Sequence, residues 1–221
     1  MKTEIIKIDT QKPDKRILKG VAEIVEKGGL VAFPTETVYG IGADYLNKKA
    51  IKRLYEVKKR PKGKPFTVHI SRFEQLTKLT CMLTLYSKGL IERFWPGPLT
   101  MVFKTASDEK IGVRMPSNRV ALEFISECRN PIVAPSANLS GNTPARNPQE
   151  VLQDLNGRID ALLDGGQTEV GVESTVLDVS EFPFRMLRKG AIEGGRIADV
   201  GRELHRKFLS PSDNGRYKEE Q

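Results

Sequence analysis

Short aliphatic runs alternate along the chain with segments whose apolar residues recur at helical spacing. Glu4–Ile8 alternates polar and apolar positions and predicts a strand. From Asp14 to Lys27 the apolar residues repeat on one helical face, and Gly28-Gly29 ends the predicted helix. The wholly apolar run Leu30–Phe33 then predicts a buried strand. Strands that alternate with helices are typical of α/β and α+β folds.

The same patterns predict the rest of the elements. A second helix is expected over Asn47–Lys59, because Asn47 is a residue type that caps helices well. Further strands are expected at Phe66–Ile70, Leu99–Lys104, Ile111–Met115, Ile132–Ala134, Ala161–Leu163 and Ser174–Val179. Further helices are expected at Leu83–Phe94, Arg119–Cys128, Pro148–Leu155 and Arg196–Phe208.

Domain organisation follows from the composition of these segments. No repeat and no Pro/Gly/Ser-rich linker divides residues 1–208, so we expect one α/β (α+β) domain there. Residues 209–221 mix Pro, Ser, Gly and charges without apolar periodicity, and we expect a flexible C-terminal tail. The 221 residues are 38% hydrophobic, which is enough at this length for a sizeable core.

Charge and cysteine content narrow the classes of partner. Lys and Arg total 36 against 28 for Asp and Glu, a formal charge of +8 that favours nucleotides, phosphates or RNA. A need for solubility explains this charge equally well. The apolar runs are too short to span a bilayer and no secretory leader is evident, so a soluble, cytoplasmic protein without a membrane partner is expected. Two cysteines and two histidines, with no CxxC, predict no metal site built by the protein.

The segment Pro34–Gly42 (PTETVYGIG) follows a predicted strand. Loops at the carboxyl ends of strands commonly form ligand crevices, and the Thr hydroxyls and the carboxylate of Glu36 suit a small polar ligand. A turn capped by these side chains explains the segment at least as well.

A basic segment, Lys58–Pro65 (KKRPKGKP), has five cations in eight residues. Clustered Lys and Arg can neutralise a polyphosphate, and the prolines and glycine favour a fairly rigid loop. The alternative is a solvated run of charge. The rigid loop favours a defined anion site.

A third segment, Pro135–Gly141 (PSANLSG), also follows a short aliphatic strand. Its hydroxyl and amide groups can bind phosphate or ribose, although an Asx or Ser turn has the same composition. Taken singly, Arg114, Lys110 and Arg188 are typical of surface ion pairs, and His69 of a semi-buried histidine. The common nucleotide-binding and hydrolase fingerprints are absent from the sequence.

Together these segments resemble one family. The resemblance rests on Pro34–Gly42, Lys58-Lys59-Arg60, Val68-His69-Ile70, Pro135–Gly141 and Glu173-Ser174-Thr175-Val176, in this order. This set is similar to the YrdC-like family over about Ile5 to Gly190, and Lys-x-Arg followed by Ser-x-Asn is its most diagnostic pair. The chain ends about thirty residues past Arg188, which resembles the short, single-domain form of the family.

The resemblance implies a fold and an activity. The expected fold is an open, twisted mixed sheet with flanking helices and a basic concave face. The expected reaction joins L-threonine, bicarbonate and ATP into threonylcarbamoyl-AMP and releases pyrophosphate, with Mg²⁺ accompanying ATP. The product would serve a downstream tRNA threonylcarbamoyl transferase complex, which modifies adenosine 37 in tRNAs that read ANN codons.

The resemblance also assigns site residues by position. The L-threonine site would consist of Thr35, His69, Arg114, Ala134 and Ser174, with Arg114 on the carboxylate and Ala134 acting through its backbone. The ATP site would consist of Lys58, Arg60, Lys62, Lys110, Ser136, Asn138, Pro144 and Arg188. The residues expected to carry catalysis are Lys58, Arg60, Ser136 and Asn138, which would stabilise charge on the phosphoryl oxygens without a covalent intermediate. Glu36 and Glu173 are the candidate carboxylates near Mg²⁺.

Two other interpretations stay open at this point. A non-catalytic module that binds double-stranded RNA or tRNA would use the same basic surface, although aromatic residues are sparse at 7%. A relative of the carbamoyl-transfer domain in hydrogenase-maturation proteins would share the fold. That domain is expected beside acylphosphatase and zinc-finger segments, which this sequence lacks.

Overall fold

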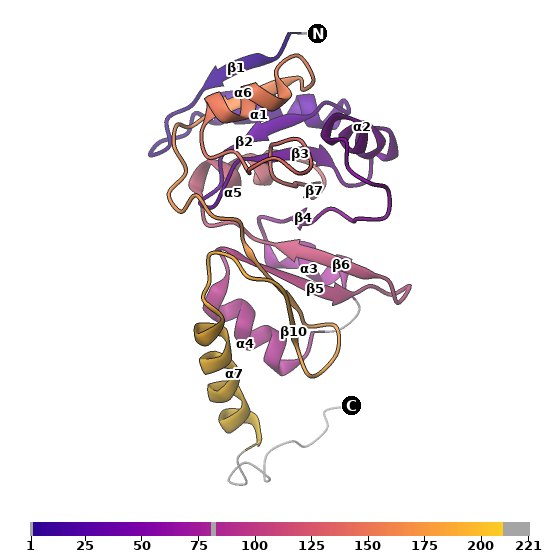
Figure 1. Cartoon of the computed structure of the whole chain (residues 1–221), viewed down its shortest axis with the longest axis vertical. Helices are drawn as coiled ribbons and strands as arrows, with labels where there is room; N and C mark the ends of the chain where they lie inside the picture. Colours follow the sequence, from indigo (N-terminus) through magenta and orange to yellow (C-terminus); the bar gives the residue numbers. More distant parts are fainter. Residues whose placement is uncertain (1, 81–82, 210–221) are drawn as a thin grey trace.

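The computed structural model describes residues 2–80 and 83–209, the last three by their backbone alone. Within these residues ten strands form one sheet in the order β1-β8-β2-β3-β7-β4-β6-β5-β9-β10 (Figure 1). The strands are β1 (Glu4–Lys7), β2 (Val31–Phe33), β3 (Gly40–Asp44), β4 (Val68–His69), β5 (Leu99–Lys104), β6 (Lys110–Arg114), β7 (Ile132–Val133), β8 (Ala161–Asp164), β9 (Thr175–Asp178) and β10 (Arg185–Arg188). The helices are α1 (Lys15–Glu26), α2 (Lys48–Lys58), α3 (Phe73–Leu79), α4 (Leu85–Phe94), α5 (Arg119–Glu127), α6 (Pro148–Leu155) and α7 (Gly194–Leu209).

The sheet mixes parallel and antiparallel pairs. β8 pairs in parallel with both β1 and β2, and β5 pairs in parallel with β9. The short strand β4 joins the two halves of the sheet, since it pairs antiparallel with β7 and parallel with β6. Strands that are far apart in sequence therefore lie side by side near the middle of the sheet, which brings their ends and loops together.

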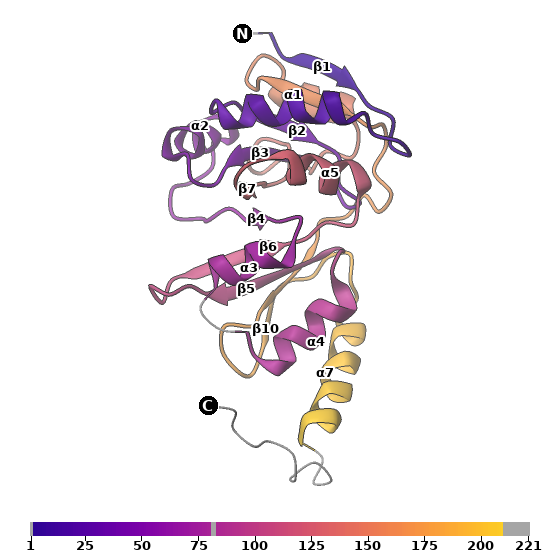
Figure 2. The same cartoon turned by 180° about the vertical axis from the view of Figure 1, so that it is seen from behind.

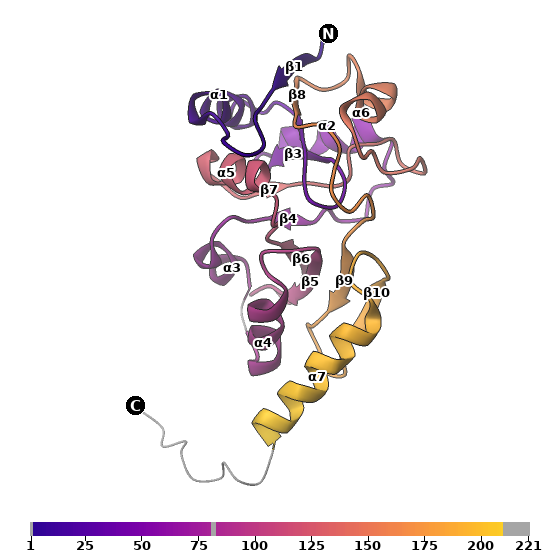
Figure 3. The ribbon, with the colours of Figure 1, turned by 90° about the vertical axis from the view of Figure 1, so that its left-hand side faces the viewer.

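Helices cover both faces of the upper half of the sheet. Figure 3 shows α1 and α5 on one side of the strands and α2 and α6 on the other. On the first side, Val21 of α1 and Phe124 of α5 pack with Phe33 and Leu163 of the sheet. On the other side, Leu54 of α2 belongs to the larger core cluster. The sheet is thus buried on both faces here, as its continuous apolar strands require.

In the lower half, α4 and α7 pack against each other and against the sheet (Figure 2). Gly89 of α4 allows the close approach, because a Cβ at this position would lie 2.4 Å from Cδ2 of Leu204. In the described part of the chain, no helix has the length and apolar character needed to cross a membrane.

Local signals explain why most predicted elements are present. The side chains of Asp14 and Asn47 accept hydrogen bonds from the first turns of α1 and α2, and Lys59 ends α2 in the left-handed conformation at φ 50°. All fourteen predicted strands and helices appear at or near their expected positions, although β4 is shorter than the expected Phe66–Ile70. The predicted tail, 209–221, lies outside the described residues except for Leu209 at the end of α7.

Three elements were not predicted: β3, α3 and β10. The β3 segment is rich in glycine because Phe33 and Ile132 press against it, and a Cβ on Gly42 would lie 3.1 Å from Cδ1 of Ile132. Glycine weakens the sequence pattern of a strand, so this one was missed. β10 is an exposed edge strand that pairs with β9 across an irregular register, so it has no apolar pattern to detect.

Candidate substrate-binding site

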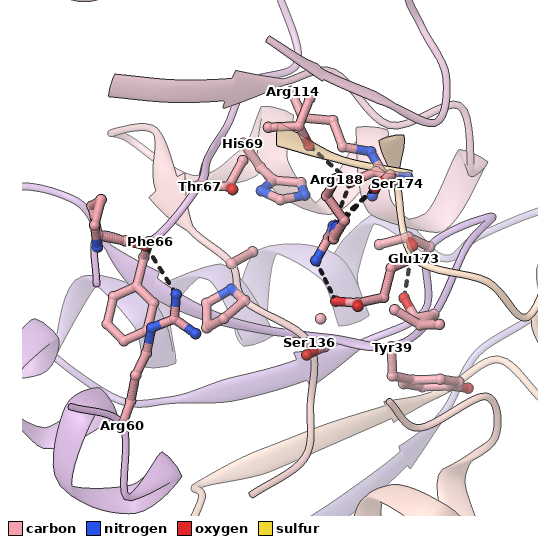
Figure 4. Close-up of a pocket in the computed structure, with 17 residues that line it drawn as sticks. Tyr39, Arg60, Phe66, Thr67, His69, Arg114, Ser136, Glu173, Ser174 and Arg188 are labelled. Atoms are coloured by element: carbon pink, nitrogen blue, oxygen red, sulfur yellow. Dashed lines mark hydrogen bonds and ion pairs between the residues drawn. The ribbon is translucent and has the colours of Figure 1, made fainter. Parts of the chain in front are cut away.

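One pocket lies where the middle strands of the sheet and their loops converge (Figure 4). The loop after β2 contributes Thr35, β4 contributes His69 and β6 ends in Arg114. The segment after β7 contributes Ser136, and β9 begins beside Ser174. Because β7, β4, β6, β5 and β9 are successive neighbours in the sheet, these separated residues meet at one place.

Arg114, which lines the pocket, forms a buried ion pair with Glu36, which does not line it. Nη2 of Arg114 lies 2.8 Å from Oε1 of Glu36, and the two side chains are only 5% and 4% exposed. This contact is an ion pair without hydrogen-bond alignment, since neither atom has a hydrogen-bond partner. Nε of Arg114 donates to the carbonyl of Gly97 at 3.3 Å. Burial lowers the pKa of Arg114 and Glu36 opposes that shift, so the guanidinium stays charged.

His69 is neutral in this environment. Complete burial, followed by the nearby charge of Arg114, lowers the pKa of its imidazole to about 3. Its Nδ1 has no hydrogen-bond partner within the protein. A buried nitrogen without a partner is costly unless a ligand completes it, so Nδ1 is suited to a polar group bound in the pocket.

Arg188 holds the segment before β9. Its Nη1 lies 2.7 Å from Oε1 of Glu173, and its Nη2 donates to the carbonyl of Ser174 at 2.9 Å and to Oγ of Ser174 at 3.1 Å (Figure 4). The Ser174 hydroxyl also lies 2.8 Å from Oγ1 of Thr100 on β5. Two hydroxyls and a guanidinium are therefore held together on this side of the pocket.

On the opposite side, Arg60 lies over the ring of Phe66, with its guanidinium carbon 5.2 Å from the ring centroid. Arg60 donates from Nε to the carbonyl of Lys64 at 3.0 Å and from Nη2 to that of Pro65 at 3.2 Å. These contacts close the basic loop on itself and keep the guanidinium beside the pocket, as Figure 4 shows.

Lys58 and Asn138 lie behind the wall of the pocket. Nζ of Lys58 donates to the carbonyls of Ser136 at 2.5 Å and Asn138 at 2.6 Å. The side-chain amide of Asn138 donates to the carbonyls of Leu139 and Asn142, both at 2.8 Å. Neither residue lines the pocket, so both support the segment that carries Ser136.

The structure thus brings together most of the residues that the sequence indicated. Eight of them line the pocket: Thr35, Arg60, His69, Arg114, Ala134, Ser136, Ser174 and Arg188. Five do not: Lys58, Lys62, Lys110, Asn138 and Pro144. Lys110 of β6 instead makes an ion pair at 2.8 Å with Asp178 of β9, on the other side of β5. Lys62 is exposed on the basic loop.

Sequence reasoning did not single out Tyr39, Phe66, Thr67 or Thr100, which also line the pocket. Tyr39 lies within the PTETVYGIG segment, and its hydroxyl donates to the carbonyl of Gly166 at 2.8 Å; burial raises its pKa. Thr100 sits in a strand that is otherwise apolar as far as Phe103, and it has no local signal of function.

The candidate carboxylates are both engaged with arginines. Glu36 faces Arg114, and Glu173 faces Arg188. Among the described residues, no three His, Cys, Asp or Glu side chains lie close enough to hold a metal ion. Of the two carboxylates, only Glu173 lines the pocket, so it is the one that could approach a cation carried in by a ligand.

A mixed, open α/β sheet gathers Arg114, Arg188 and several hydroxyls at or beside its strand ends, with Arg60 from the basic loop beside them. This arrangement defines an α/β domain suited to small anionic ligands. The chain belongs to the Sua5/YciO/YrdC family, whose model, described as telomere recombination, matches residues 23–190. The predicted family resemblance and the predicted open mixed sheet are therefore confirmed.

Several characterised proteins are similar to this chain. The threonylcarbamoyl-AMP synthase of Pyrococcus abyssi is 43% identical over 192 residues, which are 83% of this chain and 56% of that protein. The Bacillus subtilis enzyme of the same name is 42% identical over 194 residues, with the same coverage of 83% and 56%. The crystal structure of P. abyssi Sua5 complexed with L-threonine matches with a TM-score of 0.86 at 40% identity, over 90% of this chain and 61% of that one. The chain thus spans little more than half the length of the curated relatives it matches.

Proposed function

We propose that this chain catalyses the formation of threonylcarbamoyl-AMP from L-threonine, bicarbonate and ATP, with release of pyrophosphate and water. The observation that carries the proposal is the meeting of Arg114, neutral His69 and Ser174 in the same pocket as Arg60, Ser136 and Arg188. The names of the P. abyssi and B. subtilis relatives and the threonine-bound structure support the same reaction.

Threonine would bind at the buried end of the pocket. The planar guanidinium of Arg114 matches a carboxylate in shape and charge, and Glu36 on its far side holds it in place. The unpartnered Nδ1 of His69 and the hydroxyls of Thr35 and Ser174 offer partners for the hydroxyl and amino groups of the substrate. Since His69 is neutral, it does not repel the substrate ammonium group.

The chemistry requires two bond-forming steps. The amino nitrogen of threonine attacks the carbon of bicarbonate, and loss of water leaves a carbamate. An oxygen of this carbamate then attacks the α-phosphorus of ATP, and the bond from that phosphorus to the pyrophosphate oxygen breaks. Negative charge accumulates on phosphoryl oxygens in this step, and fixed cations such as Arg60 and Arg188, with the hydroxyl of Ser136, would stabilise it.

Mg²⁺ would enter as part of the substrate, bound to the ATP phosphates, with Glu173 as the carboxylate nearest to it in the pocket wall. We further propose that the product passes to a transferase that modifies adenosine 37 of tRNAs reading ANN codons, and that the reaction takes place in the cytoplasm. Both of these proposals, the transferase partner and the location, are supported by the family and by the positive charge of the chain.

The test is pyrophosphate release measured with and without threonine and bicarbonate. Replacing Arg114 by Met removes a bidentate contact to a carboxylate, worth about 3 kcal/mol, so kcat/KM for threonine should fall by about 100-fold. The exposed Arg16, replaced in the same way, is the control and should leave turnover unchanged. Tight, salt-sensitive RNA binding without any threonine-dependent turnover would instead support the RNA-binding module.

A further inference from the structure

Thr100 is a polar residue of β5 that faces away from the larger core cluster. Its neighbours Leu99 and Met101 belong to that cluster. Because side chains alternate along a strand, Thr100 lies on the opposite face of the sheet, where it lines the pocket. The residue is only 2% exposed. A buried hydroxyl is costly without a hydrogen bond, so its partner indicates its role.

That partner is Ser174. Oγ1 of Thr100 lies 2.8 Å from Oγ of Ser174, and this is the only hydrogen bond of the Thr100 side chain within residues 2–80 and 83–209. The methyl group of Thr100 lies toward β6, because a Cβ on Gly112 would be 3.6 Å from its Cγ2. β5 lies between β6 and β9 in the sheet, so the hydroxyl faces the β9 side. Threonine is restricted at χ1, and this orientation is therefore well defined.

The backbone of Ser174 is held independently of this contact. The amide of Thr175 donates to the carbonyl of Pro98 at 3.0 Å. Nε and Nη2 of Arg188 donate to the carbonyl of Ser174 at 3.1 Å and 2.9 Å. Removal of the Thr100 hydroxyl therefore leaves the start of β9 in place and releases only the hydroxyl of Ser174.

The protons of the two hydroxyls determine what they offer to a ligand. Each hydroxyl has one proton and two lone pairs. One proton lies between the two oxygens, and Nη2 of Arg188 donates to Oγ of Ser174 at 3.1 Å. When Thr100 is the donor of the pair, both lone pairs of Ser174 are filled, and the Ser174 proton is free for an acceptor in the pocket. Donors in series polarise one another, so a Ser174 hydroxyl that accepts from Arg188 and Thr100 is a stronger donor than an isolated serine.

We infer that Thr100 is a positioning residue of the threonine site: it donates to Oγ of Ser174 and thereby directs the Ser174 proton to an oxygen of the bound amino acid. The inference rests on the proposed function for the identity of the ligand. Without the Thr100 hydroxyl, Ser174 keeps its proton but loses the donor that fixes the direction of that proton.

The experiment is binding of L-threonine to the full chain without ATP, measured by isothermal titration calorimetry. Thr100→Val keeps the shape of the side chain and removes the hydroxyl, and loss of one ordering hydrogen bond should weaken threonine binding about 5- to 10-fold. Thr100→Ser retains the hydroxyl and should bind threonine within about 3-fold of the unsubstituted protein. ATP binding in the absence of threonine should change by less than about 2-fold in Thr100→Val, because no proposed phosphate contact is removed.

Thr3 provides the matched control. This residue is 3% exposed, and its hydroxyl donates to the carbonyl of Ile159 at 3.0 Å, but it does not line the pocket. Thr3→Val should therefore lower the free energy of unfolding and leave threonine binding unchanged. The comparison separates the loss of a buried hydrogen bond from a change in the site.

A double-mutant cycle with Ser174→Ala tests whether Thr100 acts through Ser174. Once the Ser174 hydroxyl is absent, Thr100→Val should cause no further loss of threonine affinity. An equal loss in both backgrounds, or no loss in Thr100→Val alone, would overturn the inference. Threonine binding that follows the expected pattern without any release of pyrophosphate would refute the proposed function and still support the role of Thr100.

Discussion

The buried pair of Arg114 and Glu36 makes a prediction about stability that the structure allows us to quantify. Replacing Glu36 by Gln keeps the shape and one acceptor oxygen but removes the charge that lies 2.8 Å from the Arg114 guanidinium. Because both side chains are at most 5% exposed, the remaining arginine charge stays buried without its counterion. Breaking such a pair costs about 3–5 kcal/mol, and since Gln still offers an acceptor, we expect about 3 kcal/mol.

The chain contains a matched control for this prediction. Glu173 faces Arg188 at 2.7 Å, a carboxylate–guanidinium pair at nearly the same distance that is also hydrogen-bonded, but its side chains are 33% and 41% exposed. Solvent screens an exposed pair, so Glu173→Gln should cost at most about 1 kcal/mol. The two variants therefore share the same substitution and differ mainly in burial.

Urea unfolding measures the difference directly. The single tryptophan, Trp95, is buried and reports unfolding by its fluorescence. We expect the midpoint of Glu36→Gln to fall well below that of Glu173→Gln, with similar slopes in both variants. Equal losses in the two variants would refute the reasoning, because burial would then have no effect on the value of the charge.

Three further predictions concern the core and two buried titratable groups. Phe124→Ala should lower the free energy of unfolding by about 3–4 kcal/mol, whereas the same change at the exposed Phe182 should cost less than about 1 kcal/mol; urea unfolding distinguishes them. With a pKa near 3, the His69 imidazole should show no titration in NMR spectra between pH 5 and pH 8, and a midpoint in that range would contradict its burial. The free energy of unfolding should also decrease as the pH falls below 6.5, because between pH 6.5 and about pH 3 only the unfolded state binds a proton at His69. The pKa of Lys58 is lowered from 10.5 to about 8, so between these two pH values only the unfolded state holds the proton. The free energy of unfolding should therefore rise by about 3 kcal/mol from pH 8 to pH 10.5. Urea unfolding over this pH range should show the rise, and Lys58→Met should flatten it.

The best-predicted parts of the fold are those with local causes. Helix α1 lies within the expected Asp14–Lys27 because its cap and its apolar face are both encoded within a few turns. The same holds for α2, which Asn47 caps. In contrast, β3 was missed because its glycines are required by close contacts with Phe33 and Ile132, which are neighbours only in the folded sheet.

The residues of the site also fall into those that the sequence indicated and those that only the folded sheet shows. The motif order indicated the threonine-site residues, and all five of them line the pocket, since they lie on or beside strands that the sheet places next to one another. Thr100 gave no signal, because its hydroxyl matters through its contact with Ser174, which directly precedes the neighbouring strand β9. Lys58 and Arg60 are two residues apart and chemically alike, yet one supports a wall of the pocket and the other lines it.

The sequence by itself determined the alternation of helices and strands, the helix caps, the family and the set of residues from which the pocket is built. Hydrophobic periodicity and capping act over short distances along the chain, so they can be read without a structure. Only the tertiary structure decided which charges are paired, which side chain of a motif turns inward and how far each pKa moves. Desolvation and ion pairing depend on neighbours from distant strands, as Glu36 and Arg114 show, and no local pattern contains that information.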